Sequence, residues 1–182
     1  VAAARESILR AVQIATTPPM GPVYINLDVL LQEAPLAAPL PKLDVARYRP
    51  PPPAAPDAAL VAKAAEWLVN AKYPVIMAGR VGGGAIGSEA GWRDRVALAE
   101  MLGARVVTDI KAPAAFPTDH PLHAASPNTF SSPELLDTLK AADVILSLDW
   151  IDLAGTLRSA FGGDHIPPKI IQCSIDQHVH HG

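Results

Sequence analysis

The chain has 182 residues, a formal net charge of -3 and an apolar fraction of 49%. This length holds one medium domain, or one domain and part of another, and the apolar fraction is sufficient for a buried core. The weak negative charge provides no positive field for a nucleic acid backbone or an anionic membrane surface, so neither is an expected partner. The single cysteine excludes an internal disulfide and suits a cytoplasmic protein.

The first predicted elements are one helix and one strand. Apolar residues recur at helical spacing from Ala3 to Ala15, and a buried strand is predicted from Gly21 to Asp28 behind a Gly-Pro turn. A single helix and a single strand cannot cover their own apolar faces, because each layer of a domain needs a partner layer. Residues 1–32 are therefore expected to be the C-terminal end of a larger domain.

Proline dominates residues 33–56, which are predicted to be a linker between domains. Proline fixes φ and removes backbone donors, so a segment of this kind is extended and fairly stiff. A disordered tail is the alternative. The internal position of the segment, between two patterned regions, favours the linker.

Helices and strands alternate in residues 57–182, the predicted second domain. The strands are apolar throughout, which is typical of parallel strands that are covered on both faces. The predicted fold class is therefore α/β, with a Rossmann-like parallel sheet flanked by helices on both faces. Strands are predicted at 74–78, 104–108, 143–148 and 169–175, and helices after Asp57, from Trp92 to Leu102, and after Ser132 with Pro133 at its first position.

The candidate ligand-binding residues follow the predicted strands, at the carboxyl edge where open parallel sheets bind ligands. A glycine-rich turn there lets a backbone approach a diphosphate, and a guanidinium can pair with phosphate oxygens. A flexible turn and a surface arginine are the alternatives, and an aspartate in this position either accepts from a ribose hydroxyl or caps the next helix. The candidates for cofactor binding are Gly79, Arg80, Gly82, Gly83, Gly84, Thr108, Asp149, Ser174 and Ile175.

The sequence contains no pattern for an active site or a metal centre of its own. A nucleophile elbow, an H-E-x-x-H motif and clustered Cys and His ligands are all missing from it. The histidines at the end of the chain, His178, His180 and His181, are interpreted as a tail rather than a metal site. Accordingly, no catalytic residue and no metal ligand is predicted.

Several segments, taken in order, carry a family resemblance. Residues 21–28 (GPVYINLD) resemble the strand that ends the pyrimidine-binding domain of thiamine-diphosphate enzymes such as acetolactate synthase, benzaldehyde lyase and pyruvate oxidase. Residues 74–79 (PVIMAG) resemble the strand that opens the central domain of these enzymes. The segments at 98–108 (LAEMLGARVVT), 116–121 (FPTDHP), 141–146 (AADVIL) and 170–176 (IIQCSID) resemble later parts of the same domain.

The resemblance implies a piece of a larger enzyme, with the central domain truncated at its C-terminus. Such an enzyme is a carboligase or decarboxylase of 2-oxo acids that uses thiamine diphosphate and Mg²⁺, and it is a homodimer or homotetramer. The family takes its catalytic carboxylate and its metal ligands from domains outside this chain, so the chain is expected to be structural and inactive alone. Gly162-Gly163-Asp164 departs from the family's metal motif, because His165 stands in place of its last glycine.

Two departures from the family bear on FAD or ADP in the central domain. The family's "GKG" reads Lys111-Ala112-Pro113 here, and its arginine-rich segment after the third strand reads Leu148-Asp149-Trp150. Each lost charge-assisted phosphate contact forgoes roughly 1.5 to 3 kcal/mol. The chain is therefore expected not to retain FAD, with any residual affinity favouring ADP-like ligands. A stand-alone nucleotide-binding or regulatory α/β module is the alternative reading, but it gives no role to the helix and strand that precede the linker.

Overall fold

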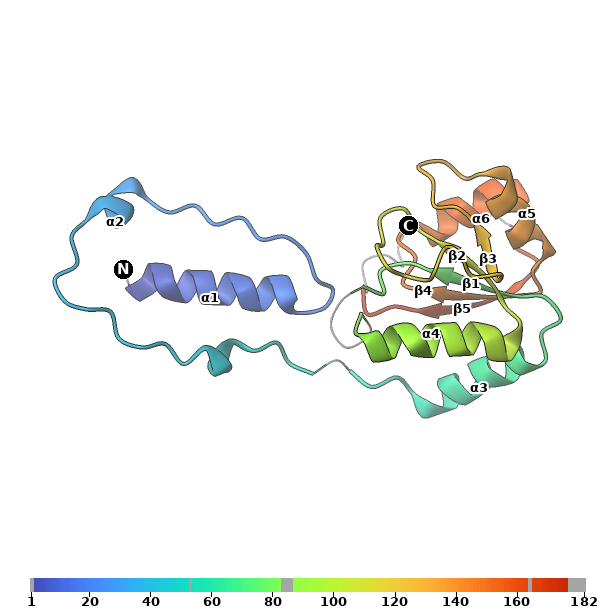
Figure 1. Cartoon of the computed structure of the whole chain (residues 1–182), viewed down its shortest axis with the longest axis horizontal. Helices are drawn as coiled ribbons and strands as arrows, with labels where there is room; N and C mark the ends of the chain where they lie inside the picture. The colour runs from blue at the N-terminus through green and yellow to red at the C-terminus, as the bar shows by residue number, and fades with distance from the viewer. Residues whose placement is uncertain (1, 53, 83–86, 164, 177–182) are drawn as a thin grey trace. The chain divides into compact units, whose positions relative to one another are not determined.

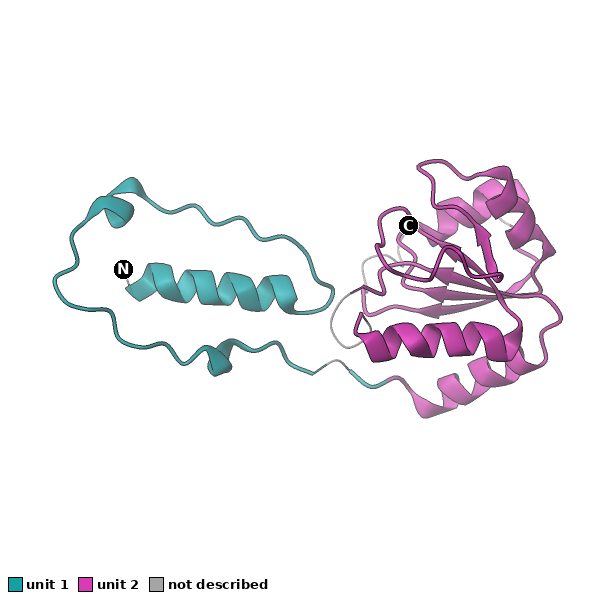
Figure 2. Ribbon diagram, in the orientation of Figure 1, with its two compact units in different colours: residues 1–55 teal, residues 56–182 magenta. Residues whose placement is uncertain are grey.

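The computed structural model describes residues 2–52, 54–82, 87–163 and 165–176. The chain divides into two compact units, residues 1–55 and residues 56–182 (Figure 2). All three tryptophans of the sequence belong to the second unit. In the part of the chain that the structure describes, no helix is long and apolar enough to cross a membrane.

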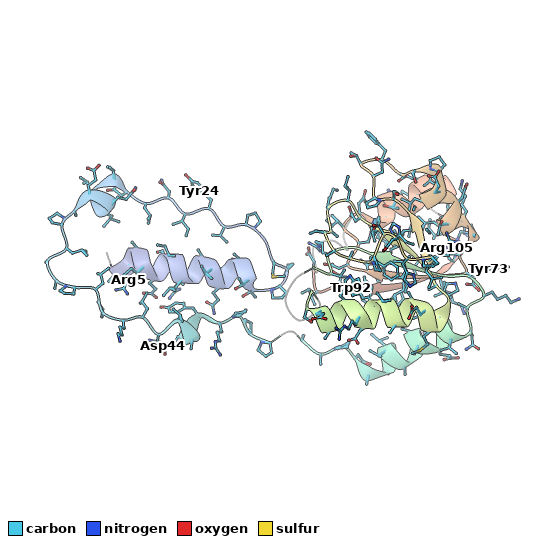
Figure 3. All side chains as sticks on the ribbon, viewed as in Figure 1. Arg5, Tyr24, Asp44, Tyr73, Trp92 and Arg105 are labelled. Atoms are coloured by element: carbon cyan, nitrogen blue, oxygen red, sulfur yellow. The ribbon has the colours of Figure 1, made fainter. Side chains whose placement is uncertain are left out.

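Helix α1 (Ala2–Thr16) is the predicted first helix, and the proline-rich segment returns alongside it within the first unit. Arg5, labelled in Figure 3, donates from Nη2 to the carbonyl of Pro41 at 2.7 Å, and Gln13 donates from Nε2 to the carbonyl of Arg49 at 3.3 Å. Both bonds join residues 36 positions apart. Residues 41–49, here called the strap, therefore run in the same direction as the helix. The strap includes a short 3-10 helix, η1 (Val45–Tyr48), and is thus not extended throughout as predicted.

The buried strand predicted at residues 21–28 is wrong. The described residues of the first unit include no strand, and Tyr24 is 89% exposed (Figure 3). The physical reason is that a β-strand exists through hydrogen bonds to a neighbouring strand, which an apolar run cannot supply by itself. Helix α2 (Val29–Glu33) follows the run, and the side chain of Asp28 caps it by accepting from the N–H of Leu30 at 2.8 Å.

A five-stranded parallel sheet forms the second unit, in the order β3-β2-β1-β4-β5. The chain starts at the centre of the sheet, moves outward through β2 and β3, and returns to the other side of β1 for the last two strands. The direction of winding therefore reverses between β1 and β4. The predicted fold class is confirmed. The strands are β1 (Pro74–Ala78), β2 (Arg105–Thr108), β3 (His123–Ala125), β4 (Val144–Leu148) and β5 (Lys169–Cys173).

Helices cover both faces of the sheet (Figure 1). Leu68 and Ala99 bury the helices α3 (Ala58–Val69) and α4 (Glu89–Leu102) against one face. Leu139 and Leu157 bury α5 (Pro133–Ala141) and α6 (Leu153–Phe161) against the other. A side chain caps the start of each helix, because the first N–H groups have no partner within the helix. The caps are Asp57, Ser88, Ser132 and Asp152, of which the sequence predicts Asp57 and Ser132.

A side-chain hydrogen bond of His123 links the edge strand β3 to β2. Its Nε2 lies 3.0 Å from Oγ1 of Thr108, and its ring stacks on that of Phe116 with the centroids 6.5 Å apart. Burial lowers the pKa of His123 below its ordinary value of 6.5, although a hydrogen bond to the backbone of Thr118 acts in the opposite direction. The imidazole is therefore neutral at neutral pH.

The lowered pKa of His123 predicts a loss of stability in mild acid. The unfolded chain titrates at the ordinary pKa of 6.5 and the folded chain below it, so between these values the unfolded state binds more protons. The contribution of His123 is complete above the unfolded pKa and is lost as the pH falls through it toward the folded pKa. Urea denaturation followed by tryptophan fluorescence, at about pH 7.5 and about pH 5.5, measures the change in the free energy of unfolding.

The control for this measurement is His123→Gln, which cannot titrate. Its free energy of unfolding should fall less between the two pH values than that of the unaltered chain. An equal fall in both proteins would show that other groups cause the acid sensitivity.

Candidate functional site

The turns that follow β1 and β4 meet at the point where the winding of the sheet reverses. The N–H of Gly79 donates to the carbonyl of Leu148 at 3.0 Å, and the N–H of Arg80 donates to the carbonyl of Asp149 at 3.0 Å. On the far side, the N–H of Asp149 donates to the carbonyl of Cys173 at 2.8 Å. Ligands of open α/β sheets bind at this reversal, so it is the candidate site.

Gly79 occupies the tightest point of this junction. A Cβ atom added there would lie 2.3 Å from the carbonyl oxygen of Asp149 and 2.6 Å from Cα of Trp150. Both neighbours are backbone atoms, which cannot turn aside as the end of a side chain can. The approach of the two turns is therefore sufficient reason for glycine at this position, without any ligand.

The side chain of Arg80 pairs with two carboxylates beyond the junction. Nε lies 2.9 Å from Oδ2 of Asp149, and Nη2 donates to Oδ1 of Asp149 at 3.0 Å and to Oδ2 of Asp176 at 2.9 Å. Ser174 donates from its hydroxyl to Asp149 and accepts from the N–H of Asp176 at 3.0 Å. Arg80, Asp149, Ser174 and Asp176 are called the Arg80 cluster below.

The Arg80 cluster is largely shielded from water. The exposed fractions of the Arg80, Asp149 and Asp176 side chains are 29%, 18% and 12%. Burial acts to lower the pKa of Arg80, but the hydrogen bonds and the charges of Asp149 and Asp176 outweigh it and raise the pKa. The guanidinium therefore remains charged within the cluster.

The charges of the cluster do not fit a diphosphate. Two carboxylates face one guanidinium, so the described cluster carries a net charge of about one negative unit. A phosphate that approached Arg80 would compete with Asp149 and Asp176 for the same donors and would be repelled by both. The predicted pairing of Arg80 with a phosphate is thus opposed by the charges of both carboxylates, which already engage Nε and Nη2.

The structure brings together four of the predicted site residues, Gly79, Arg80, Asp149 and Ser174. Thr108 instead bonds to His123, and Ile175 is 46% exposed. The remaining predicted residues continue the turn after β1: a Cβ added to Gly82 would meet its nearest neighbour at 3.4 Å, while Gly83 and Gly84 lie outside the described residues.

Asp176 completes the Arg80 cluster but is missing from the predicted set of binding residues. Its position just beyond the last predicted strand, two residues after Ser174, was the available signal. In the same described ranges, no group of three or more His, Cys, Asp or Glu residues is placed to hold a metal ion.

Comparison with known proteins identifies the family. Residues 61–180 match the family described as thiamine pyrophosphate enzyme, central domain. The chain belongs to this family. A sulfoacetaldehyde acetyltransferase of Rhodobacter capsulatus is 40% identical over 125 residues, which cover 69% of this chain and 20% of that protein. An acetolactate synthase of Mycobacterium leprae is 30% identical over 173 residues, which cover 93% of this chain and 26% of that protein.

Two solved structures share the fold of this member of the thiamine pyrophosphate family. A benzoylformate decarboxylase from Polynucleobacter necessarius superposes with a TM-score of 0.59 at 24% identity, over 97% of this chain and 32% of that one. A Mycobacterium smegmatis structure assigned to the thiamin diphosphate-dependent enzymes gives a TM-score of 0.61 at 23% identity, with the same coverage. The chain thus spans about a fifth to a third of the proteins that it resembles.

Replacing Gly79 with alanine tests whether this glycine serves the junction. We expect Gly79→Ala to destabilise the second unit by about 2 kcal/mol or more, because the added Cβ forces the two turns apart. Gly82→Ala is the matched control, since its Cβ meets only an ordinary contact at 3.4 Å, and it should change stability by less than about 1 kcal/mol. Urea denaturation with tryptophan fluorescence measures both. Equal stability of the two variants would contradict the role assigned to Gly79.

Proposed function

We propose that this chain is the central-domain portion of a thiamine-diphosphate-dependent carboligase or decarboxylase that acts on 2-oxo acids. The observation that carries the proposal is the family match over residues 61–180. The acetolactate synthase of M. leprae, which matches nearly the whole of this chain, supports a 2-oxo acid substrate. The alternative of a stand-alone nucleotide-binding module is disfavoured, because the carboxylates that pair with Arg80 oppose a phosphate.

In the proposed enzyme this chain has a structural role. Residues 1–32 are the end of the pyrimidine-binding domain, residues 33–56 are the linker, and residues 57–182 are the central domain. The remaining domains of the same protein supply the catalytic carboxylate and the Mg²⁺ ligands. The whole enzyme is proposed to be a cytoplasmic homodimer or homotetramer. Assay of the protein from the full reading frame, with thiamine diphosphate, Mg²⁺ and pyruvate, tests the proposal, and release of CO₂ is the expected result.

The 182-residue chain by itself should bind neither thiamine diphosphate nor Mg²⁺ specifically. The proposal assigns the Mg²⁺ ligands and the catalytic carboxylate to the remaining domains, and thiamine diphosphate is held through its metal-bound diphosphate. Calorimetric titration with both ligands together should give no Mg²⁺-dependent heat. A stoichiometric heat of binding at micromolar concentrations would contradict the structural role. The full-length protein serves as the positive control.

The Arg80 cluster is proposed not to support tight flavin binding. Purified chain should be colourless, without flavin absorbance, because Asp149 and Asp176 engage Nε and Nη2 of the one arginine in the cluster and repel a phosphate. An absorbance spectrum checks this directly. A yellow preparation with about one flavin per chain would show that the glycine turn and Arg80 suffice for binding.

Removing the two carboxylate charges should restore an anion site. In the double variant Asp149→Asn and Asp176→Asn, Arg80 loses both ion pairs, and asparagine tolerates the left-handed φ of 55° at position 149. We expect the affinity for ADP to rise about tenfold or more, as one charge-assisted contact would provide. Arg80→Met in the same background should abolish the gain. An unchanged affinity in the double variant would mean that the two carboxylates do not oppose anion binding at Arg80.

A further inference from the structure

A separate cavity of about 370 Å³ opens at the carboxyl ends of β2 and β3. It lies between the first turns of α5 and α6, within the second unit, and none of the Arg80 cluster lines it. Sites for small molecules measure roughly 300 to 1,000 Å³, so this cavity has room for one ring system with a compact substituent. A whole dinucleotide would not fit inside it.

The floor of the cavity is apolar and its rim carries an aromatic ring. Val107, Leu135 and Trp150 form part of the floor. Phe130 lines the cavity from the loop between β3 and α5, and it is 82% exposed. A phenyl ring left in water beside a cavity can cover a flat ligand ring by stacking, which is favourable for any heteroaromatic base.

Two aspartates in the cavity wall each accept a backbone hydrogen bond through one carboxylate oxygen, Oδ1. Oδ1 of Asp109 accepts from the N–H of Lys111 at 2.9 Å, and Oδ1 of Asp152 accepts from the N–H of Gly155 at 3.0 Å. Within the described ranges, Oδ2 of Asp109 has no hydrogen-bond donor. An aspartate directly after a parallel strand is well placed to accept from vicinal hydroxyls of a ligand. Hydroxyl and amide side chains, among them Ser126 and Asn128, also line the wall.

The same wall is unsuited to a phosphate. Helix N-termini bind phosphate through free N–H groups, but Ser132 and Asp152 take up N–H groups at the starts of α5 and α6. Asp109 and Asp152 also outnumber Lys111, the one cationic side chain among the lining residues. An anionic ligand would therefore meet a wall of net negative charge, whereas a neutral ligand would not.

We propose that this cavity binds a neutral ligand that combines a flat aromatic ring with vicinal hydroxyls, as an unphosphorylated nucleoside does. The ring lies between Phe130 and the apolar floor, and a hydroxyl donates to Oδ2 of Asp109. The absence of a phosphate is part of the specificity, because the charges of the wall select against it. The residues of the Arg80 cluster do not line this site.

Calorimetric titration of the 182-residue chain with adenosine, and separately with AMP, tests the proposal. We expect adenosine to bind with about one site per chain, and AMP to bind at least about tenfold more weakly because of its charge. Adenine and ribose, each offering half of the recognised chemistry, should both bind more weakly than adenosine. Binding of AMP as tightly as adenosine, or no adenosine binding at millimolar concentrations, would overturn the proposal.

Two variants locate the binding in the cavity. Phe130→Ala should weaken adenosine at least about fivefold by removing the stacking ring. Asp109→Asn keeps an oxygen for the N–H of Lys111 but presents an amide donor to the ligand hydroxyl, and it should weaken adenosine about tenfold or more. Circular dichroism verifies that both variants fold.

The matched controls are Tyr73→Ala and Asp137→Asn, an exposed aromatic residue and an exposed acid of the same unit that do not line the cavity. Both should bind adenosine as the unaltered chain does. Equal weakening in the cavity variants and in these controls would place the binding elsewhere and would refute the site.

Discussion

Main-chain hydrogen bonds between the turns after β1 and β4 determine what the carboxyl edge of this sheet can hold. They bring the backbone at Gly79 so close to that of Asp149 that a side chain has no space between them. In an open α/β sheet this is the point at which a crevice ordinarily forms. Here a Cβ at position 79 would meet the backbone of Asp149 and Trp150, and Asp149 itself adopts a left-handed φ of 55°.

The Arg80 cluster then fixes the electrostatics of the same place. It joins three segments of the chain that are far apart in sequence, at residues 80, 149 and 174–176. Removing one partner of such a shielded set leaves the others without compensation, which costs more than the intact set contributes. Substituting the members of such a cluster one at a time is therefore expected to destabilise the protein at each step.

The sequence predicted the parts of the fold that depend on local signals. β1 has the predicted limits, and Asp57 and Ser132 cap the helices expected of them. β3 was not predicted, because three residues are too few for a strand pattern. The strand expected at 21–28 failed for the opposite reason: its pattern is clear, but a strand also needs a neighbour, which local sequence cannot guarantee.

The sequence was enough to predict that the candidate site lies at the carboxyl edge of the sheet. It was not enough to predict which residues contact one another there. Residues after the strands could be assigned to the carboxyl edge of the sheet from the alternation of helices and strands alone. Which of them touch depends on the strand order, and only this order brings Asp149 and Asp176, which follow β4 and β5, within reach of Arg80 after β1. The cavity beside Phe130 was missed for a related reason, since it follows the unpredicted β3 and borders the unpredicted α6.

The strap of the first unit is held in an unusual way that bears on how its sequence can drift. Arg5 and Gln13 reach main-chain carbonyls of the strap, which every amino acid possesses. Substitutions between residues 41 and 49 would therefore leave both attachments intact. The insertion of one residue there would instead move the carbonyl of Arg49 away from the side chain of Gln13 and break that hydrogen bond. Evolution is expected to preserve the length of this segment more strictly than its composition.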